Sequence, residues 1–207
     1  MFNYLIRVKL PDRPGALGAV ASRIGSVGGD VVSIEILQRT DGLVVDELGV
    51  GLAADTLIDL LRDEILEVDG VTIESIRSVE GAMPDRSAEL LDVAAELFKQ
   101  SSPTGLMKHL TARVRRSLDA TFAAVLDRDA PAIVACDGEP TDPEGLVDRV
   151  AALLDGDGDA DDLALAPLDR GRMVLAVGRI HPVLRDRERR WIVTMAELAD
   201  YGWRDLR

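Results

Sequence analysis

The first thirty residues change their hydrophobic period across one short turn, and this change constrains the fold more than any other feature. From Phe2 to Leu10 every second side chain is apolar, which is typical of a half-buried strand. Pro11–Gly15 interrupts the alternation, and apolar residues then recur at every third or fourth position from Leu17 to Val27, as they do on one face of a helix. The sequence therefore predicts a strand, a tight turn and an amphipathic helix that covers one face of a sheet.

The next fifty residues continue the alternation of strands and helices. The predicted elements are a strand at 31–39, a hairpin turn at Thr40-Asp41-Gly42, a strand at 43–52, a helix at 56–66 capped by Asp55 or Thr56, and a strand at 71–79. Because the alternation of the last strand slips between Ile73 and Ile76, a β-bulge is expected there. The order β-α-β-β-α-β within about 80 residues is that of the ferredoxin-like sandwich, in which two helices cover one face of a four-stranded antiparallel sheet.

A domain of this size leaves two sheet edges and much of its surface open to solvent. Small domains bury a modest fraction of their surface, and edge strands present unpaired backbone groups to other chains. A homodimer is therefore expected.

The turn before the first helix has the physical properties of an anion site. Pro14 has a fixed φ and no N–H group, while Gly15 lets a guest approach the backbone closely. The helix that follows begins with unpaired N–H groups and the positive end of its dipole. A carboxylate fits such a site.

The segment Asp12-Arg13-Pro14-Gly15-Ala16-Leu17, with Val20, Ile24 and Gly28-Gly29-Asp30-Val31 behind it, resembles an ACT domain. The resemblance covers the motif, the order of elements and the length of the first 80 residues. It implies a regulatory fold that dimerises side by side and binds a small amino acid at the shared interface. Transferred to this chain, the implied ligand-binding residues are Asp12, Pro14 (which shapes the loop), Gly15, Ala16, Leu17 and Asp30.

The hydrogen-bonding groups of these residues are suited to binding an amino acid. Backbone N–H groups of Gly15, Ala16 and Leu17 would hold its carboxylate, and Asp12 or Asp30 would accept hydrogen bonds from its ammonium group. Leu10 offers no polar contact where some amino-acid-binding members of the family have one, so the identity of the amino acid stays open. In the alternative interpretation Gly15 only shapes the turn, the two aspartates only cap local backbone, and the domain only dimerises.

Glycine and proline at 81–86 predict a linker between domain 1–80 and a second domain at 87–207. In the second domain we expect helices from Ser87 (a cap) to Phe98, at 106–118, 143–154 and 185–201, and strands at 121–126, 132–136, 163–168 and 172–180. Strands bracketed by helices predict an α+β domain with a mainly antiparallel sheet.

The segment Met173-Val-Leu-Ala-Val-Gly-Arg-Ile180 and the following helix Arg185-Asp-Arg-Glu-Arg-Arg-Trp191 resemble a GAF-type sensory domain. In that family a late strand that ends in a small residue leads into a closing helix. The resemblance implies a second ligand site and a dimer formed through helices. The hallmark residues of the cyclic-nucleotide-binding members are not visible.

Charge and cysteine content limit the partners. A formal net charge of −13 argues against nucleic acid, because phosphate contacts need clustered Lys and Arg. The arginines at 113–116 and 185–190 are interpreted as solvated helix faces. No apolar run is long enough to span a membrane, and no secretory signal is apparent at the N-terminus. Because Cys136 is the only cysteine, no internal disulfide is possible, and the cytoplasm is the expected compartment.

The residues that carry catalysis or bind metals are scarce. His109 and His181 fall in different elements, and we expect an exposed position for the first and a turn role for the second. Cys136 is expected to be a small buried side chain. The acidic run Asp155–Asp162 departs from a calcium loop because Ala160 and Ala166 replace the required glycine and glutamate. We therefore predict no catalytic residue, no metal and no cofactor.

These observations predict a cytoplasmic, non-catalytic regulatory protein. Its first domain would dimerise and bind a small amino acid, and its second domain would sense or relay a further signal. One alternative is a scaffold that dimerises without a ligand and regulates a separate enzyme or transcription regulator. Another is an enzyme with an unrecognised site within 87–207, for which Asp137 and Glu139 are the best acids.

Overall fold

The chain forms two compact units, Met1–Pro84 and Asp85–Arg207. The computed structural model describes residues 1–157 and 160–206, with the side chains of residues 87, 204 and 205 outside the description. The boundary between the units lies within residues 81–86, where the linker is predicted. Each unit has a four-stranded antiparallel sheet of its own.

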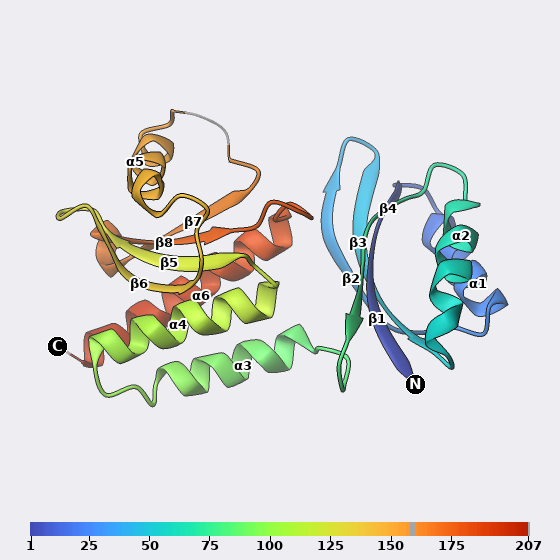
Figure 1. Cartoon of the computed structure of the whole chain (residues 1–207), viewed down its shortest axis with the longest axis horizontal. Coiled ribbons are helices and arrows are strands. Elements are labelled where there is room, and N and C mark those ends of the chain that lie inside the picture. The colour runs from blue at the N-terminus through green and yellow to red at the C-terminus, as the bar shows by residue number, and fades with distance from the viewer. Residues whose placement is uncertain (158–159, 207) are drawn as a thin grey trace. The chain divides into compact units, whose positions relative to one another are not determined.

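The N-terminal unit is the predicted ferredoxin-like sandwich. Its elements are β1 (Phe2–Pro11), α1 (Ala16–Ser26), β2 (Asp30–Thr40), β3 (Leu43–Leu52), η1 (Asp55–Leu57), α2 (Ile58–Leu66) and β4 (Thr72–Val79). The strand order is β2-β3-β1-β4, so β2 and β4 are the edges. Both helices lie on the same face of this sheet (Figure 1).

The residues whose hydrophobic period predicts this fold also form its core. Alternate residues of β1, including Ile6 and Val8, point to the helix-covered face and are fully buried. Val20 and Ile24 of α1 pack against them. The apolar stripe of each helix thus meets the apolar face of the sheet, and burial of this surface is the main stabilising contribution.

Two local predictions are confirmed and one is wrong. The β1–β4 register shifts opposite Arg7 and Val8 at the expected bulge, and Asp41 and Gly42 have the positive φ values, 53° and 74°, of a tight hairpin turn. Neither Asp55 nor Thr56 caps α2 through its side chain, because a short η1 helix precedes α2. The Asp55 carboxylate instead accepts a hydrogen bond from the Tyr4 hydroxyl.

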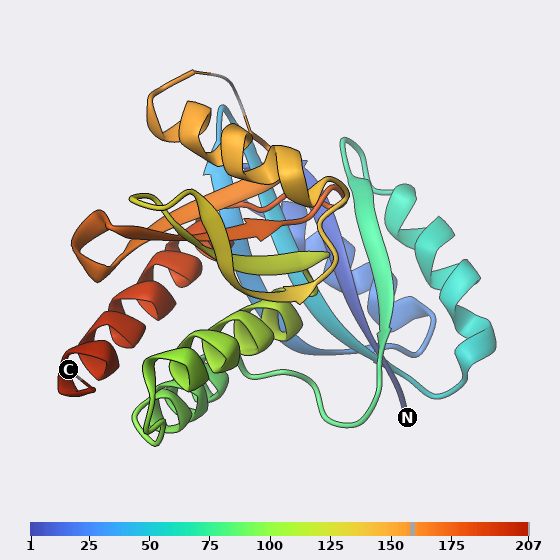
Figure 2. The ribbon, with the colours of Figure 1, turned by 60° about the vertical axis from the view of Figure 1, so that its left-hand side comes forward.

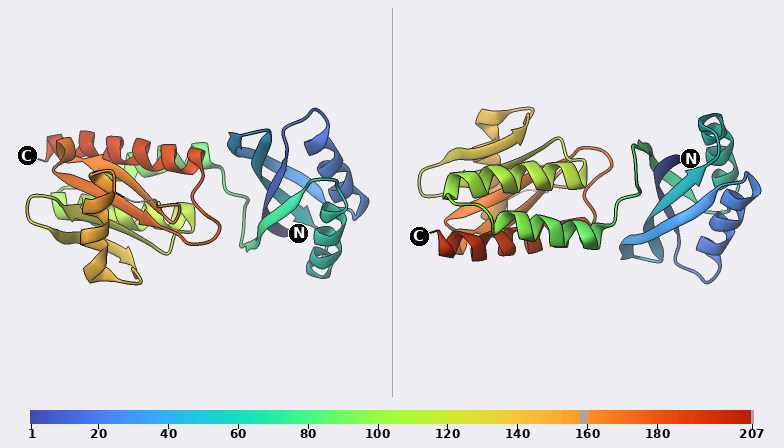
Figure 3. Two further views of the ribbon diagram at one scale, coloured as in Figure 1. Left: turned by 90° about the horizontal axis from the view of Figure 1, so that it is seen from above. Right: turned by 90° about the horizontal axis from the view of Figure 1, so that it is seen from below.

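The C-terminal unit is an α+β domain, as predicted. Its elements are α3 (Arg86–Leu97), α4 (Pro103–Leu118), β5 (Phe122–Asp127), β6 (Ala132–Gly138), α5 (Pro143–Leu154), β7 (Leu163–Leu168), η2 (Asp169–Gly171), β8 (Met173–Gly178) and α6 (Asp186–Asp205). The strand order is β6-β5-β8-β7. Figure 2 shows α5 on one face of this sheet and α4 and α6 on the other, and Figure 3 shows α3, α4 and α6 running along that second face.

The alternation of strand β5 explains the two cores of this unit. Ala123 and Val125 face the layer of α4 and α6, whereas Phe122, Ala124 and Leu126 face α5. Because both faces of the sheet are covered, the central strands are apolar from Phe122 to Leu126 and from Met173 to Val177. Strand β1 is also buried on both faces from Tyr4 to Val8, so the half-buried strand predicted for it is wrong.

Three side chains of this unit correct the sequence analysis. Cys136 is exposed rather than buried, because β6 is an edge strand. His109 is half-buried, with its Nε2 2.9 Å from the Glu96 carboxylate. Arg189 does not belong to a solvated face, because its guanidinium donates to the carbonyls of Leu163 and Ala160.

The start of α3 also differs in detail from the prediction. Helix α3 begins at Arg86, and the Asp85 carboxylate accepts from the Ala88 N–H at 3.1 Å, so Asp85 occupies the capping position. The predicted cap, the side chain of Ser87, lies outside the described part of the chain.

The Tyr4–Asp55 hydrogen bond is testable by substitution. We expect Tyr4→Phe to lower the free energy of unfolding by about 1 kcal/mol, because the buried Tyr4 side chain loses its hydrogen bond to the Asp55 carboxylate, which is exposed and can be hydrated instead. The hydrogen bond, burial and the Asp55 charge raise the pKa of Tyr4 from 10.0 to about 12, so this stabilisation is complete below pH 10 and is lost as the pH rises through 12. Urea unfolding and tyrosinate absorbance measure both effects, with Tyr201→Phe as the exposed control. Equal stability of wild type and Tyr4→Phe would contradict the assignment.

Candidate functional site

The β1–α1 turn presents free backbone donors at the start of an eleven-residue helix. Gly15 precedes the helix with φ +88°, and open space surrounds the position that a Cβ atom would occupy. The Ala16 N–H donates to the Arg13 carbonyl at 3.2 Å. In the described part of the chain, the N–H groups of Gly15, Leu17 and Gly18 have no acceptor, so three donors at the positive end of the helix dipole are available to a ligand.

Asp12 lies beside this turn and is held by an arginine. Its carboxylate Oδ2 is 3.2 Å from Nε of Arg39, near the end of β2. The Asp12 backbone N–H donates to the Gly42 carbonyl at 2.8 Å, so the hairpin β2–β3 fixes the start of the turn. Asp12 and Arg39 thus form a charged rim close to the free amides.

A buried carboxylate lies near this rim, at a position that was not predicted from the sequence. Asp46 of β3 pairs with Val8 of β1 and Ile36 of β2, which places it on the helix-covered face, and only 2% of its surface is exposed. Its Oδ1 atom has no hydrogen-bond partner among the described residues. Burial raises the pKa of Asp46, the Asp12 charge raises it further, and Arg39 opposes both effects.

A signal for Asp46 is present in the sequence. The run Leu43–Leu52 contains two acidic residues, and Asp46 is the one that shares the alternation positions of Val44, Leu48 and Val50. A buried charge without a close partner is costly and is typical of functional sites.

Within one chain, Asp30 lies far from the β1–α1 turn. It pairs with Gly51, which pairs with Asn3 near the start of β1, whereas Asp12 follows the last residue of β1. Strands β1 and β2 are both antiparallel to β3 and so run in the same direction, and the intervening strand spans roughly 27 Å. The structure therefore places Asp12, Pro14, Gly15, Ala16 and Leu17 at one end of the sheet and Asp30 at the other.

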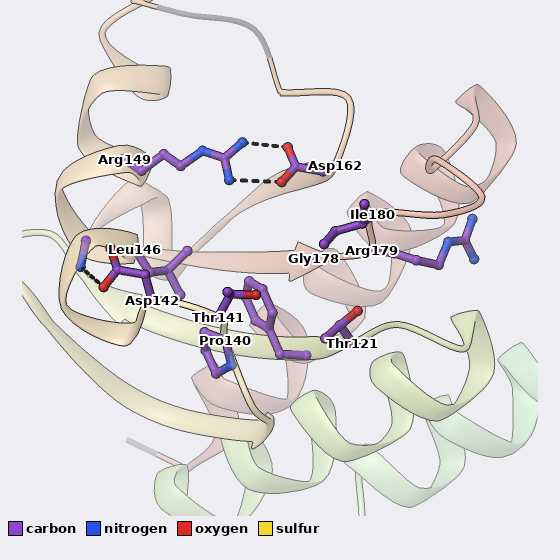
Figure 4. A pocket seen from close by; sticks show the side chains of 12 residues that line it. Thr121, Pro140, Thr141, Asp142, Leu146, Arg149, Asp162, Gly178, Arg179 and Ile180 are labelled. Carbon is purple, nitrogen blue, oxygen red and sulfur yellow. Dashed lines mark hydrogen bonds and ion pairs between the residues drawn. The ribbon is translucent and has the colours of Figure 1, made fainter.

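The C-terminal unit contains a cavity of about 370 Å³ between α5 and the strands β5 and β8 (Figure 4). It is lined by Thr121, Phe122, Pro140, Thr141, Asp142, Gly145, Leu146, Arg149, Asp162, Gly178, Arg179 and Ile180. This size is within the range of small-molecule sites. A second ligand site was expected in this unit, but none of these residues was predicted to form it.

The charged groups around this cavity are paired. Two guanidinium nitrogens of Arg149 donate to the two carboxylate oxygens of Asp162, at 3.0 and 2.5 Å. This pairing lowers the pKa of Asp162 and raises that of Arg149. The guanidinium of Arg179 is directed away from the cavity (Figure 4) and binds both oxygens of Glu188 at 2.8 Å.

The described residues contain no cluster of His, Cys, Asp and Glu that could hold a metal ion. Within the same part of the chain, no helix combines the length and apolar composition needed to cross a membrane. The acidic run Asp155–Asp162 includes residues 158 and 159, which lie outside the described part of the chain.

The solved structures that are similar to this chain include members of both families that the sequence resembles. An ACT domain protein from Streptococcus pneumoniae is 20% identical with a TM-score of 0.33, over 40% of this chain and 98% of that protein. The GAF domain of an Acinetobacter phosphoenolpyruvate-protein phosphotransferase is 14% identical with a TM-score of 0.43, over 59% and 95% of the two chains. A putative glycine cleavage system transcriptional repressor is 12% identical with a TM-score of 0.32, over 87% and 81%. No protein-family model and no curated protein matches the sequence.

The buried Asp46 makes a stability prediction. Its folded-state pKa is raised, so its ionisation destabilises the native state as the pH rises from about 4 through that pKa. We expect Asp46→Asn to be more stable than wild type by about 1 kcal/mol at pH 7, because the amide carries no charge to desolvate. The difference should shrink towards pH 4. Urea unfolding at several pH values measures it, and a variant less stable than wild type at pH 7 would contradict the prediction.

Proposed function

We propose that this chain is a non-catalytic regulatory protein whose N-terminal unit binds a free amino acid at the start of α1. The observation that carries the proposal is the Asp46 carboxylate, which is buried without a partner at Oδ1 in the same region as the Asp12–Arg39 pair. A buried acceptor of this kind is costly unless a donor reaches it. A ligand ammonium group is the donor that the proposal supplies.

The two ends of an amino acid match the two kinds of group at this site. In the proposed complex the carboxylate accepts from the N–H groups of Gly15, Leu17 and Gly18 at the positive end of the helix. The ammonium group donates to Asp46, and the Asp12–Arg39 pair closes the rim. A ligand needs both charges to satisfy both groups, so the site selects zwitterions over simple acids or amines.

A second copy of the chain would complete the site. The edge strand β2 exposes Val32, Ile34 and Ile36 by 45–50%, and an exposed apolar edge favours pairing with another strand. If two β2 strands pair antiparallel with Ile34 opposite Ile34, Val32 lies opposite Ile36. Asp30 of the partner copy then lies opposite Gln38, one residue from Arg39.

This pairing also accounts for the distance between Asp30 and the turn within one chain. The site would contain the turn of one copy and the start of β2 of the other, so a bound amino acid would contact both copies. It would stabilise one arrangement of the two copies over others and change what the C-terminal units present.

A scaffold that dimerises without a ligand is the second candidate, because pairing through the apolar edge of β2 does not require a ligand at Asp46. The two functions differ in a single property. The scaffold predicts a dimer whose stability does not respond to amino acids, whereas the sensor predicts a dimer that an amino acid stabilises.

Calorimetric titration of the full-length protein with each of the twenty amino acids tests the sensor. We expect at least one amino acid to bind, and its affinity to fall at least tenfold in Asp46→Asn, because the ammonium loses a charged acceptor. Gly15→Ala should weaken binding by a similar factor, since its methyl group would occupy the space assigned to the carboxylate. Gly28→Ala is the matched control: it also has positive φ and open space around the Cβ position, but lies at the other end of α1.

Absence of heat and of any thermal shift with all twenty amino acids at millimolar concentration would exclude amino-acid sensing. Equal loss of affinity in Gly15→Ala and Gly28→Ala would show that the backbone strain common to both acts on binding, and would contradict the assignment of the carboxylate to the turn.

The proposed dimer has its own test. We expect Ile34→Lys to convert a dimer into a monomer at micromolar concentration, because a charge would be buried at the centre of the β2–β2 pair. Leu60→Lys is the matched control, since Leu60 is equally exposed, at 49%, but lies on α2. Sedimentation velocity measures the mass of each variant. A wild-type monomer, or a dimer that persists in Ile34→Lys, would contradict the β2 interface.

A further inference from the structure

We propose that Met83 is a site of reversible oxidation, and that its sulfoxide releases the linker 81–86 from the sheet of the N-terminal unit. This inference goes beyond the proposed function, which gives the linker no role. It rests on the contact of the Met83 side chain with a glycine of β3, on the exposure of the linker and on the chemistry of the thioether group.

The Met83 side chain packs against the backbone of a central strand. Gly49 lies in β3 between Leu48 and Val50, whose side chains are in the helix-covered core, so Gly49 belongs to the opposite face of the sheet. A Cβ atom at Gly49 would lie only 2.9 Å from Sδ of Met83 and 3.0 Å from its Cγ. Glycine in a strand interior is typical of such close approaches. The missing side chain of Gly49 thus provides the space that the thioether occupies.

A hydrogen bond holds the start of the same linker. Nδ2 of Asn3 donates to the Gly81 carbonyl at 2.7 Å. Asn3 precedes Tyr4, whose side chain is in the helix-covered core, so Asn3 lies on the same face of the sheet as Gly49. Residues 81, 82, 84 and 85 are exposed, and Met83 is the only long apolar side chain within 81–86. Its thioether is therefore the main apolar anchor of the linker on the sheet.

Oxidation would remove this anchor. Met83 is half-buried, so a peroxide reaches its sulfur. A lone pair of Sδ forms a bond to one peroxide oxygen, the O–O bond breaks, and water leaves. The thioether is oxidised by two electrons and the peroxide is reduced. The sulfoxide is larger and polar, and water solvates it better than the strand backbone at Gly49 does, so the side chain would leave the sheet.

Peptide mapping of the full-length protein after brief treatment with hydrogen peroxide tests the site. We expect Met83 to oxidise at least tenfold faster than Met107 and Met195, which are 6% and 0% exposed. Methionine sulfoxide reductases should then return Met83 to the thioether. Oxidation of Met83 no faster than that of Met195 would overturn the site, and a Met83 sulfoxide that the reductases leave in place would overturn its reversibility.

Cleavage after Glu80 by a glutamate-specific protease tests the release of the linker. Mass spectrometry quantifies the fragments 1–80 and 81–207. We expect oxidation to speed this cleavage at least fivefold in the wild type, because proteolysis follows the population of the opened segment. Met83→Gln, which places a polar group near the position of the sulfur, should be cleaved at the oxidised rate without peroxide.

Met83→Leu is the matched control for the release. Leucine keeps an apolar side chain of similar volume that peroxide does not oxidise, and this variant retains the exposed Met1. Its cleavage should stay slow with or without peroxide. Equal cleavage of oxidised and untreated wild type would overturn the release, and faster cleavage of peroxide-treated Met83→Leu would overturn the assignment to Met83. Neither measurement uses an amino acid, so the result is independent of the proposed function.

Discussion

The antiparallel pairing of β3 with both β1 and β2 is the constraint on which the N-terminal unit depends. It places Asp46 between Val8 and Ile36 on the helix-covered face. The remaining paired positions on this face either pack in the hydrophobic core or lie on the edge strand. It also makes β1 and β2 run in the same direction, so the turn after β1 and the end of β2 meet. The Asp12–Arg39 pair is the direct result. A shift of one residue in either register would turn Asp46 to the opposite face.

Asp46 is unfavourable for folding alone, because an aliphatic side chain would fill the same place without a desolvation cost. Proteins commonly retain such residues where binding compensates for the lost stability. The raised pKa of Asp46 and its unpaired Oδ1 atom are two consequences of the same burial. A cationic group at that point would remove both, which is why the site is interpreted as one half of a zwitterion site.

Hydrophobic period and turn residues were sufficient to predict the elements of both units, including the bulge in β4 and the helix Pro143–Leu154. They were insufficient wherever the outcome depended on three-dimensional pairing. Cys136 follows the apolar pattern of a strand, but its strand lies at an edge. The separation of Asp30 from the turn follows from strand direction, which no local pattern encodes. Asp46 could not be singled out from the hydrophobic period, because it stands beside Glu47 and the pair interrupts an otherwise apolar run.

The two candidate sites differ in whether their charged groups already have partners within the chain. At the N-terminal site a carboxylate and several amides are left without partners, so selectivity comes from groups that a doubly charged ligand alone satisfies together. At the C-terminal cavity Arg149 pairs with Asp162, and Asp142 caps its own helix, so these charged groups already have partners within the chain.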